Sequence, residues 1–229
     1  MRQPDWNVIR SLPLFFSMNE DNFHALTATA AVQHFPQRAE LITEGNIPDF
    51  LFIALQGSVE MFCTHDGHEA TIDIVRPMTT FVLAAVIRDD VYLSSARTLS
   101  ATQVISIPAQ SAREAFVRDF AFARAIADEL VERYCDAVRS LKNEKLRTTA
   151  KRLANWILRA DAMQGNRRVI ELAFGKRTLA ASLGMTPENL SRSLARLTRH
   201  GVRVDGRDIV IEDFVALERF AKPNALIDG

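Results

Sequence analysis

The stretch KRTLAASLGMTPENLSRSLARLTRHG, residues 176–201, decides how this chain is organised. It opens with a short apolar-periodic run, breaks at Gly184, and restarts at Thr186-Pro187-Glu188. Threonine is a good N-cap, proline suits the first helical position, and an acidic residue is favourable in the first turn. We therefore expect two short helices joined by a glycine-containing turn, which is the pattern of a helix-turn-helix.

The second of these helices is predicted to have two unlike faces. Leu190, Leu194 and Leu197 recur at spacings of four and three, which places them on one buried face. The opposite face carries polar and basic side chains, namely Glu188, Ser191, Arg192, Arg196 and Arg199. A helix of this kind can pack on a domain core and present its polar side to a DNA groove.

The formal net charge of zero conceals an uneven distribution of charge. Residues 142–203 hold 14 Lys and Arg against 4 Asp and Glu, whereas the 229-residue chain has 28 of each kind, so the remainder is acidic. A basic segment beside an acidic one favours a polyanionic partner for the basic segment. The apolar share of 48% and the charged share of 24% are ordinary for a globular protein.

The cysteine content and the N-terminal sequence bear on the cellular compartment. Cys63 and Cys135 offer no disulfide framework, which fits a reducing environment. The N-terminal sequence MRQPDWNVIRSLPLFF has no signal-peptide pattern, and no segment approaches the roughly 18 apolar residues of a membrane span. We expect a cytoplasmic protein without a membrane partner.

A series of short apolar segments precedes the basic part of the chain. They are rich in β-branched and aromatic residues and include VQHF, ELIT, FLFIAL, SVEMFCT, ATIDIV, TTFVLAAVI and QVISIP. Turn signals separate them at intervals of about 8–12 residues, which is typical of a barrel or a jelly roll. Asp66-Gly67 is predicted to be a hairpin turn.

Residues 111–143 contain neither proline nor glycine and predict one long helix. An apolar stripe recurs along it at spacings of three, four, three and four, made of Ala127, Leu130, Tyr134, Ala137 and Leu141. Such a stripe suits a helix that pairs with a copy of itself, although packing on its own domain is the alternative. Because helix-turn-helix proteins commonly dimerise to read two half-sites, we favour pairing.

The predicted fold class is α+β with three parts. Residues 1–110 are expected to form a β jelly-roll effector domain, and residues 111–143 a dimerisation helix. Residues 144–229 are expected to form a winged helix-turn-helix, since the segments RRVIEL and VDGRDIVIED, on either side of the two short helices, look like strands.

This organisation resembles the CRP/FNR superfamily of bacterial transcription regulators across essentially the whole chain, including the cyclic-nucleotide-binding-like β domain. The matching residues are SLPLF at 11–15, Gly45 and Gly57 at strand turns, Leu172-Ala173-Phe174 before the helix-turn-helix, and the wing. The E-x-x-S-R pattern of Glu188, Ser191 and Arg192 looks like the base-reading set of the FNR-type branch. The resemblance implies a homodimer that reads an inverted pair of TTGA-type half-sites in double-stranded DNA, with RNA polymerase as a further partner.

The spacing of the base-reading residues supports that role by itself. Positions 188, 191 and 192 share one helix face, so all three can enter a major groove together. Arg192 can donate twice to guanine, Glu188 can accept from the cytosine amine, and Ser191 can contact a base or a thymine methyl. The expected phosphate contacts are Lys176, Arg177, Arg196 and Arg199. For Arg196 and Arg199, a solvated helix face is the alternative.

When residues 95–98 are aligned on the strand that follows the cyclic-nucleotide cassette of this superfamily, the residues that hold the nucleotide are missing from their places. Cyclic-nucleotide members use a G-E pair and a later R-S or R-T pair, whereas this chain has Phe81-Val82 and Tyr92-Leu93 at those places. A buried phosphodiester without its arginine would carry a large desolvation cost. We therefore expect no cyclic AMP and an apolar effector pocket that includes these four residues.

Other signals remain possible for this predicted pocket. A cluster of the iron–sulfur branch is excluded, because no cysteine precedes Cys63. The segment TTFVLAAVI looks like the corresponding stretch of the nitric-oxide-responsive, denitrification-associated regulators, which implies haem as the leading cofactor. The candidate iron ligands are His24, His34, His65 and His68. The alternatives are a small apolar or aromatic effector and a regulator without an effector.

A jelly-roll metalloenzyme is the competing functional class. It would use His65 and His68, yet a further histidine and a carboxylate at fixed strand offsets are not apparent. No nucleophile elbow, P-loop or zinc motif occurs either. We therefore expect a regulator and not an enzyme.

Overall fold

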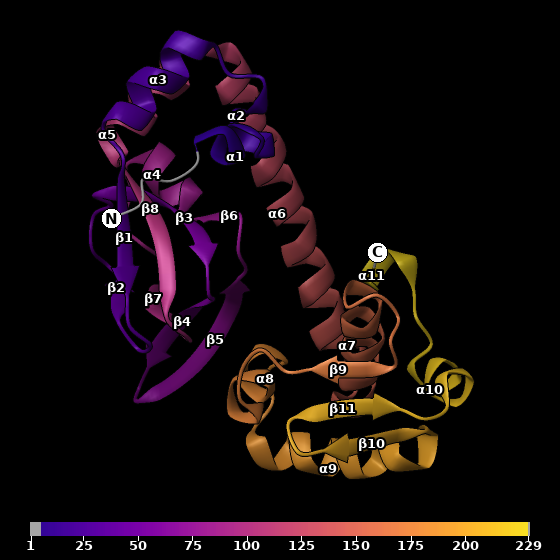
Figure 1. Ribbon diagram of the computed structural model, residues 1–229. Coiled ribbons are helices and arrows are strands. Elements are labelled where there is room, and N and C mark those ends of the chain that lie inside the picture. The colour runs from indigo at the N-terminus through magenta and orange to yellow at the C-terminus, as the bar shows by residue number, and fades with distance from the viewer. Residues whose placement is uncertain (1–5, 229) are drawn as a thin grey trace. The chain divides into compact units, whose positions relative to one another are not determined.

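The computed structural model describes residues 6–228 (Figure 1). The chain forms two compact units that divide after Tyr134, inside a long helix. We call the part up to Tyr134 the β unit and the part from Cys135 onward the winged-helix unit.

The β unit is built on two four-stranded antiparallel sheets, which confirms the predicted jelly-roll class. The first sheet has the order β1 (Ala31–Phe35), β8 (Thr102–Pro108), β3 (Phe50–Gln56) and β6 (Thr79–Phe81). The second has the order β2 (Glu40–Ile42), β7 (Ser95–Thr98), β4 (Val59–His65) and β5 (His68–Val75).

The sequence accounts for the best-buried strand and for the predicted hairpin. Strand β3 carries the FLFIAL run, and its residues from Leu51 to Ala54 are buried on both faces, as a continuous apolar run requires. Strands β4 and β5 meet at Asp66 (φ 49°) and Gly67 (φ 74°). Positive φ at both central residues is typical of a type I′ hairpin, so the predicted turn is confirmed.

Short helices complete the core of the β unit. They are α1 (Trp6–Arg10), α2 (Pro13–Phe16) and α3 (Glu20–Ala28). Phe15 of α2 is fully buried and stacks on Phe122, with ring centroids 5.8 Å apart, while Phe23 packs edge-on against Phe15. This aromatic cluster ties the N-terminal helices to the start of the long helix.

The expectation that TTFVLAAVI forms a strand is wrong for most of its length. Strand β6 stops at Phe81, Val82 has φ 59°, and helix α4 (Leu83–Arg88) follows. Leu83 and Val86, three residues apart, are both buried against the core. A short apolar run satisfies strand and helix patterns equally well, and tertiary packing decides between them.

The expectation of a single helix over residues 111–143 is also wrong. Two helices, α5 (Ala109–Arg118) and α6 (Phe120–Leu146), are separated by Asp119, whose backbone is extended (φ −118°, ψ 107°). The Asp119 carboxylate accepts the backbone N–H of Phe122 at 2.9 Å, and its other oxygen accepts from Asn19 and Asn22 at 2.8 and 2.9 Å. The side chain therefore ends one helix and caps the next.

The winged-helix unit has the predicted arrangement. Its helices are α7 (Thr149–Met163), α8 (Lys176–Ser182), α9 (Pro187–Leu197), the 3₁₀ turn η1 (Thr198–His200), α10 (Phe214–Ala221) and α11 (Ala225–Asp228). A three-stranded sheet has the order β10 (Val202–Asp205), β11 (Asp208–Ile211) and β9 (Val169–Glu171). Leu153, Ile157, Leu179, Leu197 and Ile209 are fully buried in one core. Within residues 6–228 no helix is long and apolar enough to cross a membrane.

Candidate nucleic-acid interface and sensory region

Local sequence signals fix the turn between α8 and α9. Gly184 has φ +60°, a left-handed conformation that favours glycine. Thr186 caps α9 by accepting the backbone N–H of Asn189 at 3.2 Å, and Pro187 occupies the first helical position. The predicted helix-turn-helix is therefore present, with the helix boundary at the predicted cap.

The two predicted faces of α9 are both present. Leu190, Leu194 and Leu197 are buried in the core of the unit. All five polar residues expected opposite them are exposed, namely Glu188, Ser191, Arg192, Arg196 and Arg199. The face that the core leaves free is thus the one with the chemistry for reading DNA.

The three predicted base-reading residues lie together at the start of α9. Arg192 Nη2 donates to Asn189 Oδ1 at 2.6 Å, and Ser191 Oγ donates to the carbonyl of Pro187 at 3.0 Å. The pKa of the Glu188 carboxyl is lowered by its own backbone N–H and the Thr186 hydroxyl, with Arg192 adding to the effect. Glu188 is therefore an anionic acceptor near neutral pH, which suits a cytosine amine.

The four predicted phosphate contacts are exposed, and two of them have intramolecular partners. Lys176 Nζ donates to the carbonyl of Gly206 at 3.2 Å, which places it at the wing turn. The Arg196 guanidinium lies over the ring of Phe220, 5.4 Å from the centroid. Arg177, in the first turn of α8, is a further exposed basic side chain. Arg199 is another, and it lies within the turn η1 after α9.

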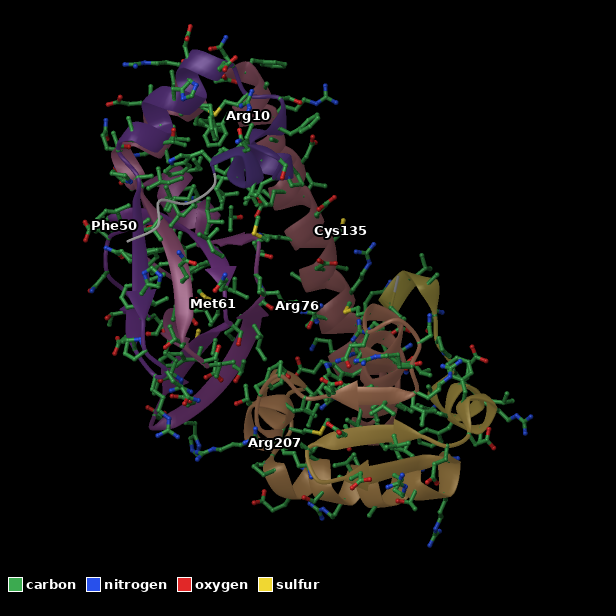
Figure 2. All side chains as sticks on the ribbon, viewed as in Figure 1. Arg10, Phe50, Met61, Arg76, Cys135 and Arg207 are labelled. Atoms are coloured by element: carbon green, nitrogen blue, oxygen red, sulfur yellow. The ribbon has the colours of Figure 1, made fainter. Side chains whose placement is uncertain are left out.

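The wing contributes a basic residue that our sequence analysis missed. Arg207 lies on the turn between β10 and β11, and its side chain is exposed (Figure 2). Asp205-Gly206-Arg207 is a hairpin signal that places this arginine at a turn, so it could have been identified. Arg203 is less suited to DNA, because it pairs with Asp205 at 3.0 Å and with Glu212 at 2.7 Å.

The exposed apolar stripe of α6 differs from the predicted stripe at two of its five positions, each shifted by one residue along the chain. Ala127, Tyr134, Ala137 and Leu141 are exposed as expected, but Leu130 packs against the core of the β unit. Between the exposed helix ends Phe120 and Leu146, the large apolar side chains on the surface of α6 are Val131 (61% exposed), Tyr134 (70%), Val138 (38%) and Leu141 (51%). With Ala127 they recur at four, three, four and three, which is a heptad seam.

The predicted effector pocket does not form as one cavity. Phe81 and Tyr92 are buried in the core between the sheets, Val82 is half-buried, and Leu93 is 82% exposed. The Phe81 ring stacks on that of Phe52, with centroids 5.3 Å apart, and both side chains are buried. Of the four residues, Tyr92 alone lines the cavity described next.

A cavity of about 470 Å³ opens between strands β1, β2 and β3. Its walls combine aromatic and aliphatic side chains with polar ones in comparable share. They include Phe35, Ile42, Phe50, Phe52 and Tyr92, with Gln33, Glu40, Asn46 and Asp49. The volume is in the range of small-molecule sites, and the lining offers both apolar contacts and hydrogen-bonding groups.

A polar cluster connects strand β6 to helix α6. The hydroxyl of Thr80 donates to the carboxylate of Glu129, and Arg133 Nη2 donates to the carbonyl of Thr80 at 2.6 Å. Arg133 also pairs with Glu129 at 3.0 Å. Two hydrogen bonds of Thr80 therefore join β6 to α6, and the Glu129–Arg133 ion pair within α6 holds both of its partners.

The four candidate haem ligands are exposed and lie on different elements. His24 is on α3, His34 on β1, and His65 and His68 flank the β4–β5 turn. His34 lines a surface hollow of about 510 Å³ together with Val32, Gln33 and Phe35. Among residues 6–228 there is no group of three or more His, Cys, Asp or Glu side chains that could hold a metal ion, so the histidines do not converge.

Comparisons with known proteins agree with this geometry. Residues 32–119 match the model of the cyclic nucleotide-binding domain, and residues 151–220 match that of the Crp-like helix-turn-helix domain. The second match contains α8, α9 and both wing strands. A comparison with curated protein sequences finds no match.

Solved structures share the fold over nearly the full chain. A candidate cAMP-binding regulatory protein from Silicibacter pomeroyi DSS-3 is 25% identical over 93% of this chain and 98% of its own, with a TM-score of 0.62. FixK2 from Bradyrhizobium japonicum is 20% identical over 86% and 99%, with a TM-score of 0.75. A CooA mutant from Carboxydothermus hydrogenoformans is 18% identical over 96% and 98%, also with a TM-score of 0.75.

Proposed function

This chain is a CRP/FNR-family transcription regulator with a DNA-binding helix-turn-helix, and from that we propose a homodimer that reads an inverted repeat of TTGA-type half-sites. One observation carries the proposal: the core of the winged-helix unit buries the leucine face of α9 and leaves its polar face free. As regulators, its relatives are not enzymes. We propose RNA polymerase as a further partner and the cytoplasm as the place of action.

The roles proposed for the three readers follow from their chemistry. Arg192 donates to guanine O6 and N7, Glu188 accepts from a cytosine amine, and Ser191 contacts a neighbouring base. Lys176, Arg177, Arg196 and Arg199 neutralise phosphates and fix the register of the helix in the groove.

The proposed dimer uses the exposed heptad seam of α6, made of Ala127, Val131, Tyr134, Val138 and Leu141. Burial of these side chains against a second copy would remove apolar surface from water. Two half-sites one helical turn apart, roughly 34 Å, require two recognition helices at a matching separation.

The proposed signal enters through the β unit, and haem with nitric oxide is the first candidate. The resemblance of residues 79–87 to the nitric-oxide-responsive branch supports haem, and His34 has the best surroundings because its hollow includes Val32 and Phe35. Bound haem would supply the iron that takes up nitric oxide. The other three histidines remain weaker candidates, since each is an exposed surface side chain.

The cavity beside Tyr92 favours a second candidate, a small apolar or aromatic effector bound directly. Cyclic AMP is not proposed, because Phe81-Val82 and Tyr92-Leu93 offer neither an arginine nor a carboxylate to it. The guanidinium of Arg97, on β7, already forms ion pairs with Glu60 and Glu69, at 2.8 and 2.5 Å.

Two measurements test the proposal. Selection of bound duplexes from a random pool should recover an inverted TTGA-type repeat, and recovery of unrelated sequences would overturn the DNA-reading assignment. A visible spectrum after haem reconstitution, with and without nitric oxide, should show a stoichiometric Soret band that His34→Ala removes and His65→Ala leaves unchanged. The absence of a band would overturn haem and leave the effector cavity as the candidate.

A further inference from the structure

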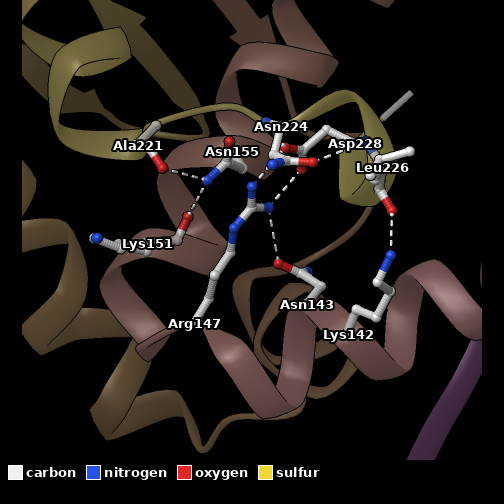
Figure 3. A network of polar contacts seen from close by, with 9 residues as sticks. All are labelled: Lys142, Asn143, Arg147, Lys151, Asn155, Ala221, Asn224, Leu226 and Asp228. Atoms are coloured by element: carbon white, nitrogen blue, oxygen red, sulfur yellow. Dashed lines mark hydrogen bonds and ion pairs between the residues drawn. The ribbon is translucent and has the colours of Figure 1, made fainter.

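A segment after the winged helix returns to the end of α6, and we call residues 222–228 the strap. Helix α10 ends at Ala221, its C-cap Lys222 has φ +50°, and the chain then turns into α11. The Asp228 carboxylate accepts two hydrogen bonds from the Arg147 guanidinium, at 2.5 and 2.6 Å (Figure 3). Because the side chains are only 6% and 11% exposed, this pair is shielded from water, unlike an ordinary surface ion pair.

One further hydrogen bond joins the strap to α6, from Lys142 Nζ to the carbonyl of Leu226 at 3.1 Å (Figure 3). Asn143, also on α6, helps to fix the guanidinium that binds Asp228, because its Oδ1 accepts a hydrogen bond from Arg147 at 3.1 Å (Figure 3). Asn224 closes the strap on itself by donating its backbone N–H to Asp228 at 2.8 Å. The strap thus contacts the last two turns of α6.

Ala221, the residue directly before the strap, is also fixed to α7. Asn155, which is buried, donates to the carbonyl of Ala221 at 3.0 Å and to that of Lys151 at 2.9 Å. Residues on both sides of the break between α6 and α7 are therefore bonded to one continuous segment. The break itself is short, since α6 ends at Leu146 and α7 begins at Thr149.

The strap lies outside the apolar core that holds the recognition helix. The core cluster of the winged-helix unit ends at Ala221 and takes no residue from the strap, whose Leu226 is 73% exposed. Removing the Arg147–Asp228 pair should therefore loosen the end of α6 without dismantling α8 and α9. A segment that adds no apolar core yet buries an ion pair at a helix junction is better suited to fixing direction than to folding the domain.

We propose that Arg147 and Asp228 are positioning residues for DNA recognition, because they fix the last turns of α6 relative to the winged helix. In the homodimer proposed above, on which this inference rests, the direction of α6 sets the separation of the two recognition helices. The pair thereby determines which spacing of half-sites the protein prefers, although neither residue touches DNA.

The test is a series of inverted repeats whose spacer is lengthened or shortened by one and two base pairs, with a single half-site as reference. Dissociation constants are measured for the full chain, for Asp228→Asn and for Arg147→Gln. The matched control is Arg167→Gln, which breaks the Arg167–Glu171 pair of the same unit, where the side chains are 58% and 66% exposed. A chain shortened to end at Pro223 lacks residues 224–228 of the strap, including Asp228, without changing Arg147.

We expect the variants to lose about fivefold or more of the preference for the best spacer, a typical coupling between sites. Their affinity for the half-site should be unchanged, and the control should keep the spacer profile of the parent chain. A uniform loss over all spacers, or an unchanged profile, would overturn the positioning role and leave the proposed function intact. Unfolding of α9 in both Asp228→Asn and the shortened chain would also overturn it. A parent chain that binds no inverted repeat better than a half-site would instead overturn the proposed homodimer.

Discussion

The guanidinium of Arg192 is held by the side chain of Asn189, one turn earlier on the same helix, at 2.6 Å. This contact keeps the arginine on the exposed face of α9 before any DNA is bound. The contact uses only one nitrogen of the guanidinium, so other N–H groups stay available for the proposed hydrogen bonds to guanine O6 and N7.

Arg192→Ala should therefore relax the choice at one base pair. We expect a loss of about 1–3 kcal/mol on the preferred site and near-equal affinities for all four base pairs at that position. Competition binding with single-base-substituted sites measures this. An equal loss of affinity on every site would contradict the base-reading role.

Arg199→Ala should weaken binding to all sequences alike. The residue is exposed in the turn after α9 and is assigned to a phosphate, so its loss should lower the salt slope of binding by about one. Titrations at several salt concentrations give the slope. A changed base preference at constant slope would argue for a base contact instead.

Tyr134→Asp should separate the proposed dimer. The side chain is 70% exposed at the centre of the α6 seam, and a charge there would have to be buried against the second copy. We expect at least about 2 kcal/mol of lost dimer stability, measured by sedimentation equilibrium. Asp128→Asn, at an exposed position beside the seam, is the control and should leave association unchanged.

Asp119→Ala should destabilise the β unit by about 2–3 kcal/mol near neutral pH, because a buried carboxylate with several hydrogen-bond donors is lost. Burial raises the pKa of Asp119, but hydrogen bonds from Asn22 and from the backbone N–H groups of Phe122, Asn19 and Ala121 outweigh it, so the net pKa is lowered.

Because the pKa of Asp119 is lowered, the destabilisation by Asp119→Ala should depend on pH in a definite direction. A depressed folded-state pKa contributes stability above the unfolded pKa of about 3.9 and loses it as the pH falls through the folded value. The gap between parent and Asp119→Ala in urea unfolding should therefore be full at pH 7 and shrink below about pH 4. A gap that is constant down to acidic pH would show that the charge is not involved.

Gly201→Ala should destabilise the winged-helix unit far more than Gly206→Ala. Both glycines have positive φ, +75° and +58°, so both variants carry a left-handed strain of about 1–2 kcal/mol. At Gly201 a Cβ would also lie 2.5 Å from the Cβ of Asp213 and 2.6 Å from its backbone nitrogen, whereas nothing lies within 4 Å at Gly206. We expect a further loss of about 1–3 kcal/mol at Gly201 alone, seen as a lower Tm.

Local patterns were sufficient for the helix-turn-helix and for the β4–β5 hairpin. The cap at Thr186, the leucine spacing of α9 and the turn at Asp66-Gly67 each depend on residues that are neighbours along the chain. Backbone dihedral preferences and side-chain capping determine such features from neighbouring residues alone. The placement of Glu188, Ser191 and Arg192 on one free face could be predicted for the same reason.

The register of the dimer seam and the break at Asp119 could not be predicted in this way. Leu130 and Val131 are both apolar, and the core of the β unit decides that Leu130 packs inward and Val131 stays outside. Asp119 interrupts the helix because Asn19 and Asn22, about a hundred positions earlier, supply donors to its carboxylate.

The sequence by itself determined a jelly-roll unit followed by a winged helix with a polar recognition face, because turn signals and periodicity are local. Only the tertiary structure decided that Phe81 and Tyr92 are buried in one core cluster, that a cavity opens beside Tyr92, and that Asp228 pairs with Arg147. Each of these features depends on contacts between side chains that are far apart in the chain. A local sequence pattern does not contain the information that would predict such contacts.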